Sequence, residues 1–95
     1  MHAAALRIEL HLPQARSLKD KRAMIRPIIE GSRHRFGVAA AEVGKQDLWQ
    51  ASELAFAAVA STAGHVEEVL GSVERFVWSF PEVEVVVCER DWWGA

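Results

Sequence analysis

The order strand, helix, strand occurs twice along the chain, over residues 3–43 and 50–89, and this repetition constrains the fold more than any other feature. In the first strand every second residue is a large aliphatic one: Leu6, Ile8, Leu10 and Leu12. A period of two predicts a strand with one buried face. Pro13 ends this strand, because a residue without an N–H cannot take part in a central ladder.

The first helix is predicted to begin at Ser17, where Asp20 stands in a capping-box position, and to end at Gly37. Its predicted buried stripe consists of Leu18, Ile25, Ile29 and Phe36. Pro27 lies about 180° around the axis from that stripe. We therefore expect Pro27 on the solvent side of one bent helix, and two short helices that meet there are the alternative.

Four further elements complete the pattern: strands over residues 38–43 and 49–62, a helix over residues 66–80, and a strand over residues 82–89. The order βαββαβ predicts one α+β domain over residues 1–95, a ferredoxin-like sandwich with a four-stranded antiparallel sheet and both helices on one face. The first and third strands are expected in the centre. The side chains predicted to face the helices are Leu6, Ile8, Leu10, Leu54, Phe56, Val83, Val85 and Val87.

The other face of this sheet has no cover inside one chain. Small and apolar side chains are predicted there: Ala55, Ala57, Val59, Val86 and Cys88. Because an uncovered apolar patch usually marks an interface, these residues predict a homodimer, most simply a two-fold one.

Charge is distributed unevenly, although the formal net charge is only −2. Residues 16–35 contain seven basic and two acidic residues, whereas residues 36–95 contain three basic and ten acidic ones. On the first helix the stripe Lys19, Arg22, Arg26 and Arg33 spans about 60°, and Arg16 precedes it. Such cations can neutralise RNA phosphates, and the alternative is a solvated face that pairs with the protein's own acids.

A tryptophan stands beside a carboxylate and an amide in the segment Asp47-Leu48-Trp49-Gln50. Trp49 can stack on a nucleic-acid base or serve as an aromatic anchor in packing, and packing is the commoner role of such a residue.

Motifs for catalysis, phosphate loops and metal sites are missing from the sequence. The four histidines are scattered, and Cys88 is the single cysteine, so we expect no metal, no cofactor and no intrachain disulfide. The longest uncharged run has about 13 residues, too few to cross a bilayer. No signal peptide is visible at the N-terminus. These features predict a cytoplasmic protein that is not an enzyme and not bound to a membrane.

Several segments together resemble the YlxP-like family of small bacterial proteins: Leu6 to Pro13, Ser17-Leu18-Lys19-Asp20-Lys21-Arg22, Arg33 to Phe36, Ala41-Glu42-Val43 and Asp47-Leu48-Trp49-Gln50. The resemblance implies a domain of unknown function with a ferredoxin-like fold. The family's genes commonly lie among genes for translation initiation and ribosome maturation, which implies a role with ribosomal or other structured RNA. The family pattern has Arg where this chain has Ala51, and Asn where it has Gly37.

Three hypotheses for function follow from these features. The first is a non-enzymatic protein that associates with RNA or the ribosome through Arg16, Lys19, Arg22, Arg26, Arg33 and Trp49. The second is a structural or interaction domain that self-associates through its open sheet face. The third is a small-molecule sensor with its ligand at a dimer interface. The fold alone does not separate them.

Overall fold

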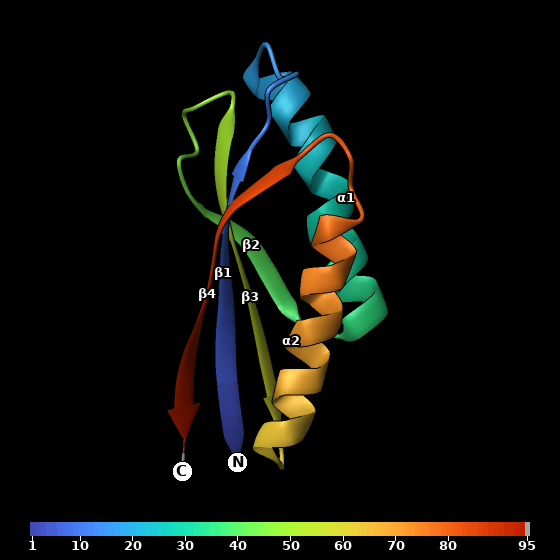
Figure 1. Ribbon diagram of the computed structural model, residues 1–95, viewed down its shortest axis with the longest axis vertical. Coiled ribbons are helices and arrows are strands. Elements are labelled where there is room, and N and C mark those ends of the chain that lie inside the picture. The colour runs from blue at the N-terminus through green and yellow to red at the C-terminus, as the bar shows by residue number, and fades with distance from the viewer. Residues whose placement is uncertain (95) are drawn as a thin grey trace.

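The computed structural model describes residues 1–94 and contains six elements in the predicted order (Figure 1). They are β1 (His2–His11), α1 (Leu18–Phe36), β2 (Ala39–Gly44), β3 (Ala51–Ala60), α2 (Ala63–Trp78) and β4 (Glu84–Gly94). The third strand is shorter than predicted at both ends, because Trp49 and Gln50 belong to the loop before it and Thr62 caps the start of α2.

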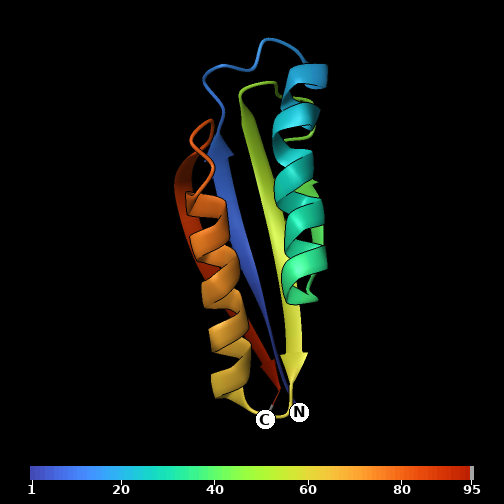
Figure 2. The same ribbon diagram turned by 90° about the vertical axis from the view of Figure 1, so that its right-hand side faces the viewer.

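The four strands form one antiparallel sheet in the order β2-β3-β1-β4, and both helices cover the same face (Figures 1 and 2). The predicted ferredoxin-like α+β fold is thus confirmed, with the first and third strands in the centre. The loop that joins β2 to β3 and the start of α1 lie at the same end of the molecule, far from the N-terminus (Figure 1).

The core lies between the sheet and the helices. The alternating residues of the central strands are buried as predicted, with at most 2% of each exposed: Leu6, Ile8, Leu10, Leu54 and Phe56. Helix α2 adds Val66, Leu70, Val73 and Val77, which are fully buried. Regular spacing of large apolar residues therefore placed the centre of this fold correctly.

Helix α1 runs without a break through Pro27, which is exposed as expected. The Ser17 hydroxyl accepts a hydrogen bond from the Asp20 N–H at 3.0 Å, and this bond caps the helix start. At the other end Gly37 has a φ of 67°, in the left-handed region. Asn tolerates this conformation better than most residues, so the Asn of the family pattern would also fit there.

The buried side of α1 differs from the predicted one. Its buried residues are Lys21, Ile25, Ile28 and Ser32, whereas Leu18, Ile29 and Phe36 are only half-buried. Phe36 instead packs edge-on against Phe76 of α2, with ring centroids 5.7 Å apart. The predicted stripe faced partly toward the neighbouring helix, and hydrophobicity alone could not show that a lysine belongs on the inner side.

A β-bulge in β4 overturns two predictions about that strand. Leu10 pairs with Val85 but the adjacent Glu9 pairs with Val87, so Val86 is an extra residue in the ladder. Beyond the bulge Cys88 pairs with Ile8 and lies on the helix side, where it packs against the core. Val87 pairs with Glu9 on the open face. The predictions of Cys88 on the open face and Val87 in the core were therefore wrong.

Candidate nucleic-acid interface

The loop over residues 45–50 has a fixed backbone although its side chains are exposed. It begins with Lys45, whose φ of 58° is unusual for a residue with a side chain. The Leu48 N–H donates to the Lys45 carbonyl at 3.1 Å and closes a tight turn. This turn needs further support, because a left-handed lysine is strained.

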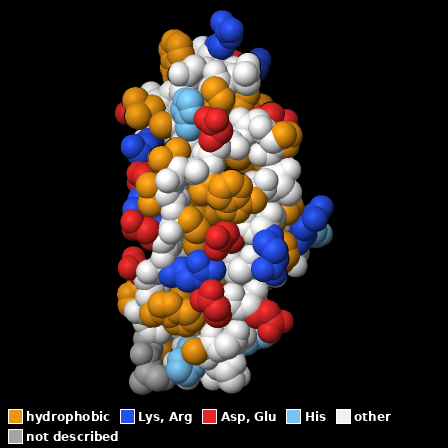
Figure 3. Space-filling view, in the orientation of Figure 1, with side chains coloured by type: hydrophobic (Ala, Val, Ile, Leu, Met, Phe, Trp, Pro, Cys, Tyr) orange, Lys and Arg blue, Asp and Glu red, His pale blue; other side chains and the backbone are white. Residues whose placement is uncertain are grey.

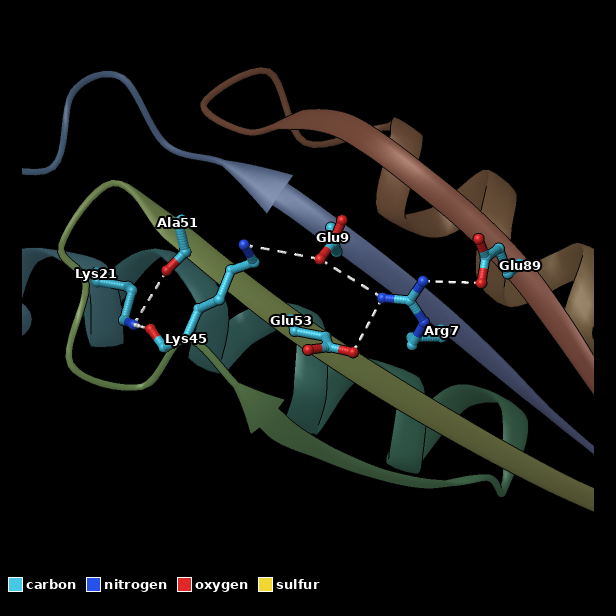
Figure 4. A network of polar contacts seen from close by, with 7 residues as sticks. All are labelled: Arg7, Glu9, Lys21, Lys45, Ala51, Glu53 and Glu89. Carbon is cyan, nitrogen blue, oxygen red and sulfur yellow. Dashed lines mark hydrogen bonds and ion pairs between the residues drawn. The ribbon is translucent and has the colours of Figure 1, made fainter.

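Lys21 supplies that support from α1 (Figure 4). Its side chain is 1% exposed, and its ammonium donates to three backbone carbonyls of the loop region: Lys45 at 2.9 Å, Gln46 at 3.1 Å and Ala51 at 3.1 Å. The same nitrogen lies 2.9 Å from Oε2 of Glu42. Both ends of the loop are therefore attached to α1 by one buried charge.

Lys21 is the residue of this region that sequence reasoning missed. It was counted only among the basic residues of the first helix. Its spacing from Ile25 and Ile28 contained the signal, because residues four and seven positions apart lie on one helix face. A lysine at such a position predicts a buried ammonium that needs several acceptors, and the loop carbonyls provide them.

Gln50 attaches the other side of the loop to the segment that follows β1. Its side-chain amide donates to the carbonyls of Pro13 at 3.3 Å and Ala15 at 3.2 Å. The main-chain carbonyl of Gln50 accepts a hydrogen bond from the Leu12 N–H at 2.9 Å. The loop and the entry to α1 therefore form one rigid end of the molecule.

Trp49 projects from this rigid end with 54% of its surface exposed, and Leu48 beside it is 52% exposed. Trp49 is therefore not buried within the chain, and its roles in stacking on a base or packing in an interface stay predictions. Two shallow hollows meet at Trp49. One is lined by His11, Asp47, Leu48, Trp49, Gln50 and Ala51, and the other by Pro13, Ala15, Arg16, Trp49 and Gln50. The structure thus brings together Trp49 and Arg16, which the sequence separates by more than thirty residues.

The cations on α1 and just before it differ in their contacts. The side chains of Arg16, Lys19, Arg22 and Arg26 are exposed, and none forms an ion pair within residues 1–94. Arg33 is exposed too, but its guanidinium donates to the Ala40 carbonyl of the edge strand β2, from Nε at 3.1 Å. We call the first four residues the basic ridge; Arg33 stands apart because it already has a structural partner.

Cations on the open sheet face are all engaged by acids (Figure 4). The Arg7 guanidinium lies 2.8 Å from Glu89, 3.0 Å from Glu53 and 3.5 Å from Glu9. Hydrogen bonds to Glu89 and then Glu53 raise the pKa of Arg7 above its ordinary value. Lys45 lies 3.7 Å from Glu9. The part of the open face around Arg7 and Lys45 therefore has its cations paired with carboxylates and offers no free positive charge.

The predicted oligomer interface is divided by the fold. Ala55, Ala57 and Val59 lie on the open face of β3, and two alanines of β2, Ala39 and Ala41, pair with the first two. Val86 lies in the bulge of β4, on the opposite side of β1, and Cys88 faces the helices. Burial raises the pKa of the Cys88 thiol, and Glu74 adds to the effect. Of the five predicted interface residues, the three on β3 therefore lie together, next to the alanines of β2.

Basic and acidic side chains lie intermixed over the side of the molecule formed by β4 and α2 (Figure 3). One such cluster joins Arg90 to Glu67 at 3.0 Å and to Glu74 at 3.1 Å. Over residues 1–94, no three His, Cys, Asp or Glu side chains are grouped as a metal ion would need. Neither of the two helices in that range is long and apolar enough to cross a membrane.

The fold and this end of the molecule define a class, a ferredoxin-like α+β domain with an exposed tryptophan beside a basic helix. The chain matches the family model described as "Protein of unknown function (DUF503)" over residues 3–90. It is 38% identical over 78 residues to "Uncharacterized protein YlxP" of Bacillus subtilis (strain 168). The aligned stretch covers 82% of this chain and 85% of that protein. The chain belongs to this family of unknown function, and the resemblance noted in the sequence is confirmed.

The residues that carry the family resemblance have clear structural roles here. Ser17 and Asp20 cap α1, Lys21 fixes the loop carbonyls, and Gln50 ties the loop to the segment before α1. All four act at the end of the molecule where Trp49 is exposed. The segments Ser17 to Arg22 and Asp47 to Gln50 therefore build and stabilise one surface, although they lie in separate parts of the sequence.

Proposed function

We propose that this protein is a non-enzymatic RNA-binding protein of the cytoplasm, with ribosomal or other structured RNA as its target, and that it binds through the basic ridge and Trp49. The absence of ion pairs on Arg16, Lys19, Arg22 and Arg26 within residues 1–94 carries the proposal. The alternative was a helix face that pairs with the protein's own acids. Seven acids of the described chain pair instead with Arg7, His11, Lys21, Lys45 and Arg90, and Glu30, which lies nearer the ridge, forms no ion pair.

Two further features support this proposal. The ridge begins beside Trp49, because Arg16 and Trp49 border the same hollow. Cations that neutralise phosphates supply affinity without sequence preference, and an aromatic side chain beside them can stack on a base. The acidic remainder of the chain would repel RNA elsewhere, so the complex would form in one orientation.

The test measures binding of the full chain to purified ribosomes and to a structured ribosomal RNA fragment over a range of salt concentrations. We expect affinity to fall steeply with salt, and the triple variant Lys19→Gln, Arg22→Gln, Arg26→Gln to reduce the slope by about 2–3. The matched control changes two paired cations, Arg7→Gln and Lys45→Gln, and should keep the wild-type slope. No retention of the wild type on either RNA at low salt would refute the proposal.

Self-association through the open face is the second candidate function. Ala39, Ala41, Ala55 and Ala57 form a smooth surface between β2 and β3, and Val59 at its end is 67% exposed. Small side chains would let a second sheet approach closely. Light scattering should then show a dimer that Ala57→Arg converts to a folded monomer, and a wild-type monomer at tens of micromolar would count against this candidate. A sensor with its ligand at such an interface would require the dimer first.

A further inference from the structure

Trp49 is an exposed aromatic residue in a loop whose backbone is fixed by hydrogen bonds. Its neighbours in sequence are fixed on both sides, by the turn from Lys45 to Leu48 and by the three hydrogen bonds of Gln50. A side chain on a mobile loop loses conformational entropy when it binds, but this backbone is ordered beforehand. An exposed indole on an ordered backbone is an arrangement that lets a base stack at low cost.

The two hollows that meet at Trp49 differ in charge. The hollow toward β1 is lined by Asp47 and His11, and Asp47 forms no ion pair within the described chain. The hollow toward α1 is lined by Arg16, and the carbonyls of Pro13 and Ala15 there are already used by Gln50. A phosphate fits beside Arg16 and is repelled by Asp47. A base with hydrogen-bond donors on its edge fits beside Asp47.

Resting on the proposed function, we infer that Trp49 binds one unpaired base of RNA, stacked in the hollow toward β1, with an adjacent phosphate at Arg16. The base belongs to the class with an exocyclic amino group, since the Asp47 carboxylate accepts hydrogen bonds and repels carbonyl oxygens. Cytosine, adenine and guanine all carry such an amino group, and guanine presents it next to its N1–H. Uracil presents two carbonyl oxygens around a single N–H and has no amino group.

The geometry also favours single-stranded segments over a duplex. A base inside a helix is stacked on both sides and paired along its edge, so neither Trp49 nor Asp47 could reach it. Loops, bulges and ends of structured RNA present unstacked bases whose faces and edges are free. The basic ridge would then lie along the neighbouring phosphates, which is consistent with a structured RNA that offers both features.

The experiment measures binding of the full chain at low salt to labelled oligo(C), oligo(A) and oligo(U), and to a blunt duplex of the same length. We expect oligo(C) and oligo(A) to bind on the order of 10-fold more tightly than oligo(U). Trp49→Ala should weaken oligo(C) binding by on the order of 10-fold, and Trp49→Phe should restore most of it. Trp78→Ala is the matched control, because Trp78 on α2 is 61% exposed and lines neither hollow.

Asp47→Asn tests the choice of base separately from stacking. An amide both donates and accepts, so this variant should bind oligo(U) and oligo(C) about equally while Trp49→Ala still weakens both. Equal binding of all oligonucleotides by the wild type would overturn the assignment to Asp47. Equal binding of duplex and single strands, with no effect of Trp49→Ala, would overturn the whole inference and leave RNA binding by the ridge intact. Failure of every RNA, duplex included, would instead refute the proposed function.

Discussion

Two regions of this molecule contain seven of its 11 lysines and arginines, and the contacts of these cations differ between the two regions. On the open sheet face and at the buried Lys21, every cation contacts carboxylates or backbone carbonyls within 3.7 Å. At the start and on the outer side of α1, the side chains of the basic ridge form no ion pair in the described part of the chain. Lys19 and Lys21 show the contrast most sharply, since only one residue separates them.

The difference teaches that pairing, and not the number of charges, separates a structural charge from a binding one. A paired ammonium such as Lys21 contributes to the fold and has no capacity left for a ligand. An exposed cation without a partner adds little to stability, because water solvates it well. It remains available to an anion from outside. Three experiments test this comparison, from the largest expected effect to the smallest, and a fourth tests the position of the bulge in β4.

Lys21→Met should lower the free energy of unfolding by about 3–5 kcal/mol, because it leaves the Glu42 carboxylate and three carbonyls without their shared donor. The matched change Lys19→Met should alter it by less than about 0.5 kcal/mol. Urea unfolding followed by circular dichroism measures both values. Similar losses for the two variants would show that the comparison is wrong at its clearest point.

Arg26 and Arg33, the last two residues of the predicted stripe, should differ in the same way. Arg26→Gln should reduce the salt dependence of RNA binding by a slope of about 1 and leave stability unchanged within about 0.5 kcal/mol. Arg33→Gln should instead destabilise the fold by about 1 kcal/mol, because the edge carbonyl of Ala40 loses its donor. Parallel salt titrations and urea melts distinguish these outcomes. An equal loss of slope in both variants would place Arg33 in the ridge.

Arg7→Gln should destabilise the protein less than Lys21→Met does, through repulsion among Glu9, Glu53 and Glu89. The loss should shrink in about 1 M salt, which screens exposed charges over a few ångströms. Because the pKa of Arg7 is raised, its charge persists at every pH of interest, so no basic transition from this residue is expected below pH 12. Thermal melts at low and high salt provide the measurement, and RNA affinity should stay unchanged.

The smallest expected effect is on the reactivity of Cys88, and its measurement also tests the position of the β-bulge in β4. Burial raises the pKa of its thiol, so the folded protein should react with a thiol reagent at pH 8 more slowly than the urea-unfolded chain does. The sign for stability follows from the same shift. The unfolded thiol ionises first, so stability should fall as pH rises above about 8.5. Rapid labelling of the native protein would place Cys88 on the open face after all.

The alternation of β1 and the apolar spacing of α2 were enough to predict the order of elements, the central strands and most of the core. These patterns succeeded because side-chain direction in a regular strand or helix depends only on position. The exposure of Pro27 and of the basic ridge followed from the same geometry. The predicted orientation of the β4 residues after Val86 was wrong, because one inserted residue reverses the direction of every later side chain in the strand.

The sequence by itself therefore determined the ferredoxin-like topology, the family and the identity of the exposed cations, because each depends on local periodicity or local motifs. Only the tertiary structure decided which cations have partners, which carbonyls bind the ammonium of Lys21, and that Trp49 lies beside Arg16. Those facts depend on contacts between residues far apart in the chain, such as Lys21 with Ala51 and Gln50 with Ala15. No local pattern specifies such contacts, because they arise when the packed sheet and helices bring distant loops to the same end of the molecule.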